Sequence, residues 1–243
     1  MGLELYLDLH SQPCRAVYIF AKKNNIAFEF KLVDLRAGQQ FSEEFGKVNA
    51  LRVVPAIKDG DFTLGESVAI LKYLACKYQT PDHWYPADLQ KRARVDEYLS
   101  WQHMTIRYHG SRIFMFRGLL PALTGQPIPK DRMDEALEDL QKSMQIFEDK
   151  FLQGKPYIVG EKVSLADLVA LVELMQPLGT GVDPLEGWPK LIEWRERVKG
   201  DVGKALFDEA HATLMKSKIS IKALDCNSPM MQQLAKTLQK RYK

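Results

Sequence analysis

The chain has 243 residues, 46% of them hydrophobic, so it can bury a core and form one large domain or two small ones. Its 34 basic and 31 acidic residues are too balanced for a protein that binds nucleic acid or a membrane surface. The longest apolar tract, Leu165 to Leu178, is interrupted by Asp167 and Glu173 and cannot span a bilayer. Three scattered cysteines lack metal-ligand spacing and are typical of a reducing compartment. We therefore expect a soluble, cytoplasmic protein with no metal site.

The beginning of the chain predicts a strand that leads directly into a helix. Leucines alternate with other residues from Leu3 to Leu9, which is typical of a half-buried strand. Pro13 suits the first turn of a helix, where its missing N–H would have no partner. Ser11 stands at the junction, where free backbone N–H groups and the helix dipole favour negative charge. A serine here is often only an N-cap, so this stretch alone leaves open whether Ser11 meets a ligand.

The next segments complete a small α/β unit. Apolar residues alternate with charged ones over Phe28–Leu32 and predict a second strand, parallel to the first because a helix connects them. A short helix is expected around Ser42–Lys47. Asp59-Gly60 lies between two apolar runs and predicts a hairpin, and Glu66-Ser67 begins another helix. The order βαβ then ββα is that of a thioredoxin-like domain with a mixed sheet.

From residue 89 onward the spacing of apolar residues is helical almost throughout. The segment QTPDHWYPAD, with two prolines and no periodicity, is expected to be a linker. Ser164 and Asp167 have the spacing of a capping box and begin a buried helix. The other helices are predicted over Leu89–Arg117, Asp131–Leu152, Trp188–Val198, Leu206–Lys216 and Pro229–Lys243, with a break at Gly118–Lys130. The expected fold is α/β plus all-α: a thioredoxin-like domain (1–80), a linker (81–90) and a helical domain (91–243).

Several short motifs occupy characteristic places in this architecture. Ser11 follows the first strand, Val54-Pro55 precedes the third, Glu66-Ser67 opens the third helix, and SLADL begins at Ser164. In type and spacing these motifs resemble those of the cytosolic glutathione transferases. The runs GLELYLD and PDHWYPADLQKRARVDEYL are similar to the theta class in particular. The resemblance covers nearly the whole chain and weakens after about Ala223.

The resemblance implies an enzyme that conjugates glutathione, its co-substrate, to small hydrophobic electrophiles. Alkyl and aralkyl halides and epoxides are the implied substrates, together with organic hydroperoxides, which such enzymes reduce. Ser11 is implied to be the catalytic residue, and Arg107 is implied to face the electrophile pocket. A homodimer is also implied. Whether the C-terminal tail, Pro229–Lys243, folds over the site is left open.

The implied glutathione contacts have simple physical interpretations. In this family the Val54-Pro55 bond is cis and turns the backbone at Val53 and Val54 outward, where it can pair with the cysteinyl unit. Ser67 and the N–H groups at its helix start can hold the γ-glutamyl carboxylate, and Glu66 can accept from the α-ammonium group. Many theta enzymes have histidine where this chain has Gln40, which can donate a hydrogen bond to the glycyl carboxylate but carries no charge. We therefore expect weaker glutathione binding.

The energy that Ser11 must supply is of a plausible size. A thiol has a pKa of about 8.5, and lowering that pKa by about two units requires about 2.7 kcal/mol. A hydroxyl that donates to the charged sulfur supplies about 1.5–3 kcal/mol, and a helix N-terminus supplies about 0.3–1 kcal/mol. Ser11 at its helix is therefore sufficient without a buried base.

Two alternatives remain open at this stage. Cys14 could be the nucleophile of a glutathione-dependent thiol transferase, although its place inside the helix favours burial. The chain could also be a non-catalytic glutathione-binding domain, against which the intact Ser11, Glu66 and Ser67 argue. The sequence also leaves open whether Arg15 adds positive potential to the site or is solvated. His10 is expected to be a packing residue.

Overall fold

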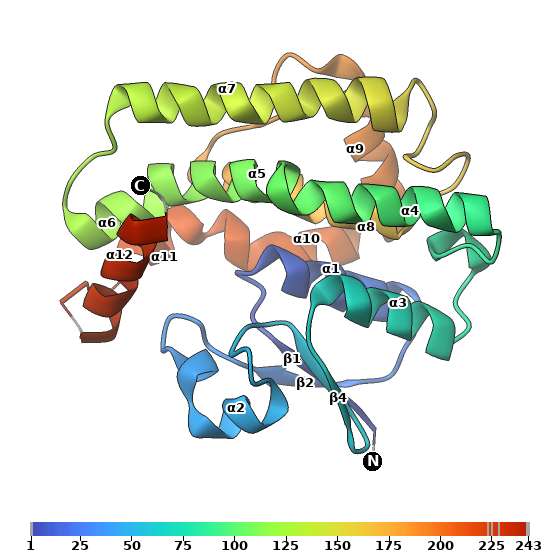
Figure 1. Ribbon diagram of the computed structural model, residues 1–243, viewed down its shortest axis with the longest axis horizontal. Helices are drawn as coiled ribbons and strands as arrows, with labels where there is room; N and C mark the ends of the chain where they lie inside the picture. Colours follow the sequence, from blue (N-terminus) through green and yellow to red (C-terminus); the bar gives the residue numbers. More distant parts are fainter. Residues whose placement is uncertain (1, 223, 225, 228, 242–243) are drawn as a thin grey trace.

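The computed structural model describes residues 2–222, 224, 226–227 and 229–241 (Figure 1). Residues 2–77 form a four-stranded mixed sheet in the order β2-β1-β3-β4, with helices packed against it. The strands are β1 (Leu3–Leu7), β2 (Glu29–Leu32), β3 (Ala56–Asp59) and β4 (Phe62–Leu64). The helices are α1 (Gln12–Lys23), η1 (Gln39–Phe41), α2 (Glu43–Val48) and α3 (Ser67–Lys77). The predicted order of strands and helices is confirmed.

The pairing of the strands also follows the prediction. β1 is parallel to β2 and antiparallel to β3, and β3 and β4 form the hairpin around Gly60. Leucines of β1 at positions 3, 5 and 7 are buried, which places the core on one face of the sheet. β2 is an edge strand of the sheet, and its apolar side chains Phe30 and Leu32 are 39% and 63% exposed. The alternation of apolar and charged residues in β2 therefore does not mark a buried face.

The second part of the chain is helical and lies on the side of the sheet that α1 and α3 cover (Figure 1). Its long elements are α4 (Leu89–Trp101), α5 (Ile106–Phe114), α7 (Lys130–Ile146), α8 (Leu165–Leu174), α9 (Pro189–Val202), α10 (Lys204–Met215) and α12 (Pro229–Arg241). Its short elements are η2 (Asp82–Trp84), η3 (Gln102–Met104), η4 (Met115–Leu119), α6 (Leu120–Thr124), η5 (Phe147–Leu152), η6 (Pro177–Thr180) and α11 (Ser217–Lys222).

The prediction of one continuous helix over Leu89–Arg117 is wrong. A 3-10 turn interrupts it, and Thr105 has φ −124° and ψ −97° there. After α5 the chain continues as the π-helix η4 and then as α6, so much of the predicted break at Gly118–Lys130 is helical as well. Gly118 permits close packing in this region, because a Cβ on it would lie 2.9 Å from Cδ1 of Ile221. Hydrophobic spacing remains helical across such interruptions, which is why the sequence does not reveal them.

The predicted capping box at the start of α8 is confirmed. Asp167 accepts hydrogen bonds from the backbone N–H of Ser164 at 2.9 Å and from its hydroxyl at 2.8 Å. The same buried carboxylate accepts from the Ile158 N–H and from the Trp194 indole, at 2.9 and 3.0 Å. Asp167 therefore fixes α8, a helix buried along its whole length, at the centre of the helical part.

The two parts share one continuous hydrophobic core. α1 packs on α8 and α10, so the turn between β1 and α1 meets the helical part directly. α12 lies beside α6, at the same end of the molecule (Figure 1). None of the described helices is both long enough and apolar enough to cross a membrane.

Candidate active site

A cavity of about 310 Å³ lies between the β1–α1 turn and the C-terminal helices. Its polar lining includes the sequence-predicted Ser11 and Gln40, together with His10, Gln12, Arg36, Gln176 and Ser217. The opposite lining is apolar and comes mainly from Phe114, Met115, Leu119, Ile221, Leu224, Met231, Leu234 and Leu238. A charged nucleophile and an apolar reactant could therefore meet here.

Ser11 occupies the N-cap position of α1, but its side chain makes no capping hydrogen bond. Its backbone is held by a hydrogen bond from its N–H to the Asp8 carbonyl at 2.9 Å, and its carbonyl accepts from the Arg15 N–H at 3.1 Å. The interpretation of Ser11 as a plain N-cap is therefore wrong. Ser11 lines the cavity at the N-terminus of a twelve-residue helix.

Cys14, the nucleophile of the alternative enzyme, lies inside α1 and is fully buried. Burial raises the pKa of its thiol to about 12, although a hydrogen bond with the Ser11 side chain acts in the opposite direction. Thiolate is the reactive form, so a buried thiol of this kind is a poor nucleophile near neutral pH. The structure therefore argues against the thiol transferase alternative.

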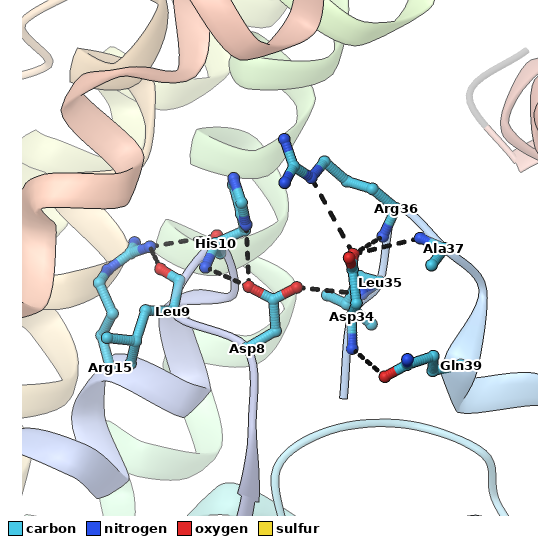
Figure 2. Close-up of polar contacts among 9 residues, drawn as sticks. All are labelled: Asp8, Leu9, His10, Arg15, Asp34, Leu35, Arg36, Ala37 and Gln39. Atoms are coloured by element: carbon cyan, nitrogen blue, oxygen red, sulfur yellow. Dashed lines mark hydrogen bonds and ion pairs between the residues drawn. The ribbon is translucent and has the colours of Figure 1, made fainter. Parts of the chain in front are cut away.

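Asp8 joins the turn that carries Ser11 to the loop that carries Arg36 (Figure 2). Its Oδ1 accepts from the His10 N–H at 2.9 Å and pairs with His10 Nδ1 at 2.8 Å, and its Oδ2 accepts from the Leu35 N–H at 3.0 Å. Burial raises the pKa of Asp8, but the hydrogen bonds from His10 and Leu35 outweigh it and lower the pKa below its usual value. His10 was expected to be a packing residue, but it lines the cavity.

Arg15 is fully buried, so its interpretation as a solvated side chain is wrong. Its Nη1 donates to the carbonyls of Leu9 at 2.9 Å and His10 at 3.1 Å, and its Nη2 donates to Oε1 of Gln176 at 2.6 Å (the carbonyl contacts are drawn in Figure 2). Burial lowers its pKa to about 10, which still leaves the guanidinium charged at neutral pH. Arg15 therefore fixes the β1–α1 turn against the helical part.

The predicted glutathione contacts at Val53 and Val54 lie in the loop before β3. The Val54-Pro55 peptide bond is cis, as the resemblance implies. Asn49, which sequence reasoning did not identify, shapes this loop by donating from Nδ2 to the Val53 carbonyl at 2.8 Å. The Val53 side chain is exposed at the surface of the loop.

Glu66 and Ser67 lie at the start of α3, outside the lining of the cavity. Glu66 is exposed and has φ +63°, a conformation that a residue with a side chain rarely adopts and that is often found at functional sites. Ser67 is buried as the first residue of α3, where backbone N–H groups have no partner within the helix.

Gln40 reaches the cavity from η1. Its Oε1 is buried and has no hydrogen-bond partner among the described residues. Buried polar atoms are almost always paired in folded proteins, so an unpaired oxygen that faces a cavity suggests a ligand there.

Arg107 is not among the residues that line the cavity. Its Nη1 lies 3.6 Å from Oε1 of the buried Glu173, and its side chain is about one-third exposed. Burial raises the pKa of Glu173 to about 7, although the positive charges of Arg107 and Arg15 act to lower it. Burial lowers the pKa of His103. The charge of Arg107 also lowers this pKa, and the charge of Glu66 raises it. The role of Arg107 in an electrophile pocket therefore stays a prediction.

Sequence reasoning did not identify Gln12, Arg36 or Gln176 as part of the site. Gln12 donates to the hydroxyl of Ser111 at 2.8 Å, a contact between residues far apart in the chain. No local pattern marks such side chains. Within the described part of the chain, His, Cys, Asp and Glu residues form no group of three or more that could hold a metal ion.

Comparisons with known proteins agree with this arrangement. Residues 2–76 match the family model of the glutathione S-transferase N-terminal domain, and residues 112–200 match that of the C-terminal domain. The chain is 56% identical to human glutathione S-transferase theta-1 over 218 residues, which cover 90% of this chain and 91% of that protein.

Two solved human structures cover the whole of this chain and are covered wholly by it. One is glutathione-S-transferase T1-1 in its apo form, with 52% identity and a TM-score of 0.93. The other is a theta-class glutathione transferase in complex with the glutathione conjugate of 1-menaphthyl sulfate, with 47% identity and a TM-score of 0.94. The chain therefore belongs to the theta class of the glutathione S-transferases.

Proposed function

We propose that this glutathione transferase activates the glutathione thiol with the Ser11 hydroxyl and transfers the sulfur to small hydrophobic electrophiles. The observation that carries the proposal is the position of Ser11. Ser11 lines the cavity at a helix N-terminus, and its side chain makes no capping hydrogen bond. A hydroxyl that donates to the sulfur favours the thiolate, and the helix dipole acts in the same direction.

The two parts of the chain divide the work. Residues 1–80 hold glutathione, with Val53 and Val54 pairing with its cysteinyl unit and Gln40 donating to the glycyl carboxylate. Ser67 and the free N–H groups of α3 bind the γ-glutamyl carboxylate, and Glu66 accepts from the α-ammonium group. The strained backbone of Glu66 supports these assignments, and Gln40 lines the same cavity as Ser11. After the linker at 81–90, residues 91–243 supply the electrophile pocket.

The class of electrophile follows from the apolar wall of the cavity. α5, η4, α11 and α12 contribute phenylalanine, leucine, isoleucine and methionine side chains to it. Such a wall suits alkyl and aralkyl halides, epoxides and organic hydroperoxides, in keeping with the conjugate bound in the human theta-class structure. Arg107, whose partly exposed side chain lies beside the buried Glu173, is assigned to hold polar groups of the electrophile near glutathione.

We also propose that the protein is a cytoplasmic homodimer. Apolar side chains are exposed on the loop before β3, on β4, just after α3 and on α4, and a second copy could cover them. They include Leu51, Phe62, Tyr78 and Leu89. Analytical ultracentrifugation tests the dimer, and a monomer at micromolar concentration would contradict it. Fractionation of cells that express the protein tests its location.

The decisive experiment for the catalytic proposal compares the wild type with Ser11→Ala, Ser11→Thr and Cys14→Ala on an aralkyl halide. Turnover should fall about 10–100-fold in Ser11→Ala, in proportion to a lost hydrogen bond to a charged group, and recover in part in Ser11→Thr. Cys14→Ala should retain activity. Loss in Cys14→Ala alone would assign the chemistry to the thiol, and glutathione binding without turnover by the wild type would identify a binding domain.

A further inference from the structure

His10 lies beside Ser11 in the lining of the cavity, and its contact with Asp8 orients its ring. Asp8 Oδ1 pairs with His10 Nδ1 at 2.8 Å and also accepts from the His10 backbone N–H at 2.9 Å. Figure 2 shows that the other ring nitrogen points away from Asp8. The Asp8 carboxylate can only accept, so Nδ1 carries a hydrogen, and Nε2 is the atom free to act on a reactant.

The substrates that fit the cavity differ in what their leaving atoms need. A halide leaves as a stable anion and takes no proton. An alkoxide from an epoxide or a hydroperoxide is a strong base, so its departure is faster when a nearby group donates a proton. Removing a proton donor should therefore slow the reactions of epoxides and hydroperoxides but not those of halides.

Among the described residues that line the cavity, His10 alone carries an imidazole, the side chain that most often serves as a general acid or base. The lining also includes the Arg36 guanidinium, the amides of Gln12, Gln40 and Gln176, and serine hydroxyls, which are side chains that rarely serve as proton donors in catalysis. The rest of the lining is apolar. Ser11 is already assigned to the sulfur.

We propose that His10 is the general acid of this enzyme for substrates with an oxygen leaving atom. This inference rests on the proposed function, since Ser11 must first supply the thiolate. With an epoxide, the sulfur forms a bond to carbon and the carbon–oxygen bond breaks. The protonated ring of His10, which carries a hydrogen on both nitrogens, gives its Nε2 proton to the oxygen and keeps the Nδ1 hydrogen on Asp8. The proton released when the next glutathione thiol ionises restores His10, so the net reaction is addition of glutathione.

With a hydroperoxide the same proton completes a different reaction. The thiolate attacks the terminal oxygen, a sulfur–oxygen bond forms, and the oxygen–oxygen bond breaks. The alkoxide takes the proton of His10 and leaves as an alcohol, while glutathione becomes the sulfenic acid. A second glutathione converts the sulfenic acid to the disulfide and water, so sulfur is oxidised by the two electrons that the peroxide gains.

The test compares His10→Gln with the wild type on three substrates: an aralkyl halide, an epoxide and cumene hydroperoxide. Glutamine can still donate to Asp8 but cannot transfer a proton, and His10→Leu serves as a second variant. We expect kcat/KM to fall at least tenfold for the epoxide and the hydroperoxide in both variants. For the halide it should stay within about twofold, and KM for glutathione should not change.

Arg36→Gln is the matched comparison, because Arg36 lines the same cavity and carries charge without releasing a proton. It should affect the three substrates alike. Equal losses in His10→Gln for all three substrates, an increased KM for glutathione, or no loss would overturn the proposal. So would a wild type that converts the halide but neither oxygen substrate. Unchanged halide turnover in Ser11→Ala would instead overturn the proposed role of Ser11.

Discussion

The Arg15 guanidinium donates to Oε1 of Gln176 across 2.6 Å, and this contact joins α1 of the first part of the chain to the turn between α8 and η6 in the second. The other side of the guanidinium donates to the carbonyls of Leu9 and His10, which directly precede Ser11. The position of the proposed catalytic hydroxyl therefore depends on a buried cation that both parts of the chain share.

Arg15→Leu should lower the free energy of unfolding by about 2–4 kcal/mol, because it leaves buried carbonyls and the Gln176 amide without their donor. Arg15→Lys should recover only part of this loss, since one ammonium group cannot reach both sets of acceptors. Denaturation by urea measures both effects. Arg94→Leu is the control, because Arg94 is exposed on α4. A loss in Arg15→Leu no larger than that in Arg94→Leu would contradict the role assigned to Arg15.

The sequence predicted the elements whose signals are local. The alternating leucines of β1, the Asp59-Gly60 turn and the capping box at Ser164 each depend on neighbouring residues, and all three are confirmed. The sequence did not predict that Arg15 is buried, because its partner Gln176 lies far along the chain.

Three other differences between the predicted and the observed structure also leave no local pattern in the sequence. The interruption at Thr105 keeps the helical spacing of apolar residues on both sides, so it leaves no pattern to read. α11, which was not predicted, is only six residues long and contributes to the cavity wall through packing. The place of His10 in the candidate site depends on its contact with Asp8 and on the shape of the cavity, and the cavity shape is not encoded in neighbouring residues.

Glu173→Gln should change how stability depends on pH. Burial raises the pKa of Glu173 from 4.5 to about 7, which corresponds to about 3 kcal/mol. The folded protein therefore holds this proton more tightly than the unfolded chain, and the free energy of unfolding falls as pH rises from about 4.5 to about 7.

Removing the carboxyl group removes this decline, so the stability of Glu173→Gln relative to the wild type should rise by up to about 3 kcal/mol between pH 4.5 and pH 8. Urea denaturation at a series of pH values measures the difference. Glu193→Gln, at an exposed position on α9, is the control and should show a much smaller change. A difference that does not vary with pH would show that Glu173 does not titrate in this range.

Gln40→His should lower KM for glutathione several-fold below pH 7, because a protonated imidazole adds charge opposite the glycyl carboxylate. Gln40→Ala should raise KM, since it removes the hydrogen-bond donor. Initial rates at varied glutathione and fixed halide concentration give both values. An unchanged or higher KM in Gln40→His would count against the assignment of Gln40 to the glycyl carboxylate.

Leu238→Ala should raise KM for an aralkyl halide about 3–10-fold, because Leu238 forms part of the apolar wall on α12. KM for glutathione should stay the same. Gln239→Ala changes the exposed neighbour on the same helix and should affect neither value. Equal changes in the two variants would show that α12 does not contact the electrophile.

In the proposed mechanism, Ser11 lowers the pKa of the thiol of bound glutathione. Ultraviolet difference spectra of the thiolate, recorded during a pH titration of the glutathione complex, measure this pKa directly. The wild-type complex should titrate about two units below free glutathione, and the Ser11→Ala complex should titrate close to the free value, with binding otherwise retained. Equal pKa values in the two complexes would contradict the claim and require another source for the stabilisation of the thiolate.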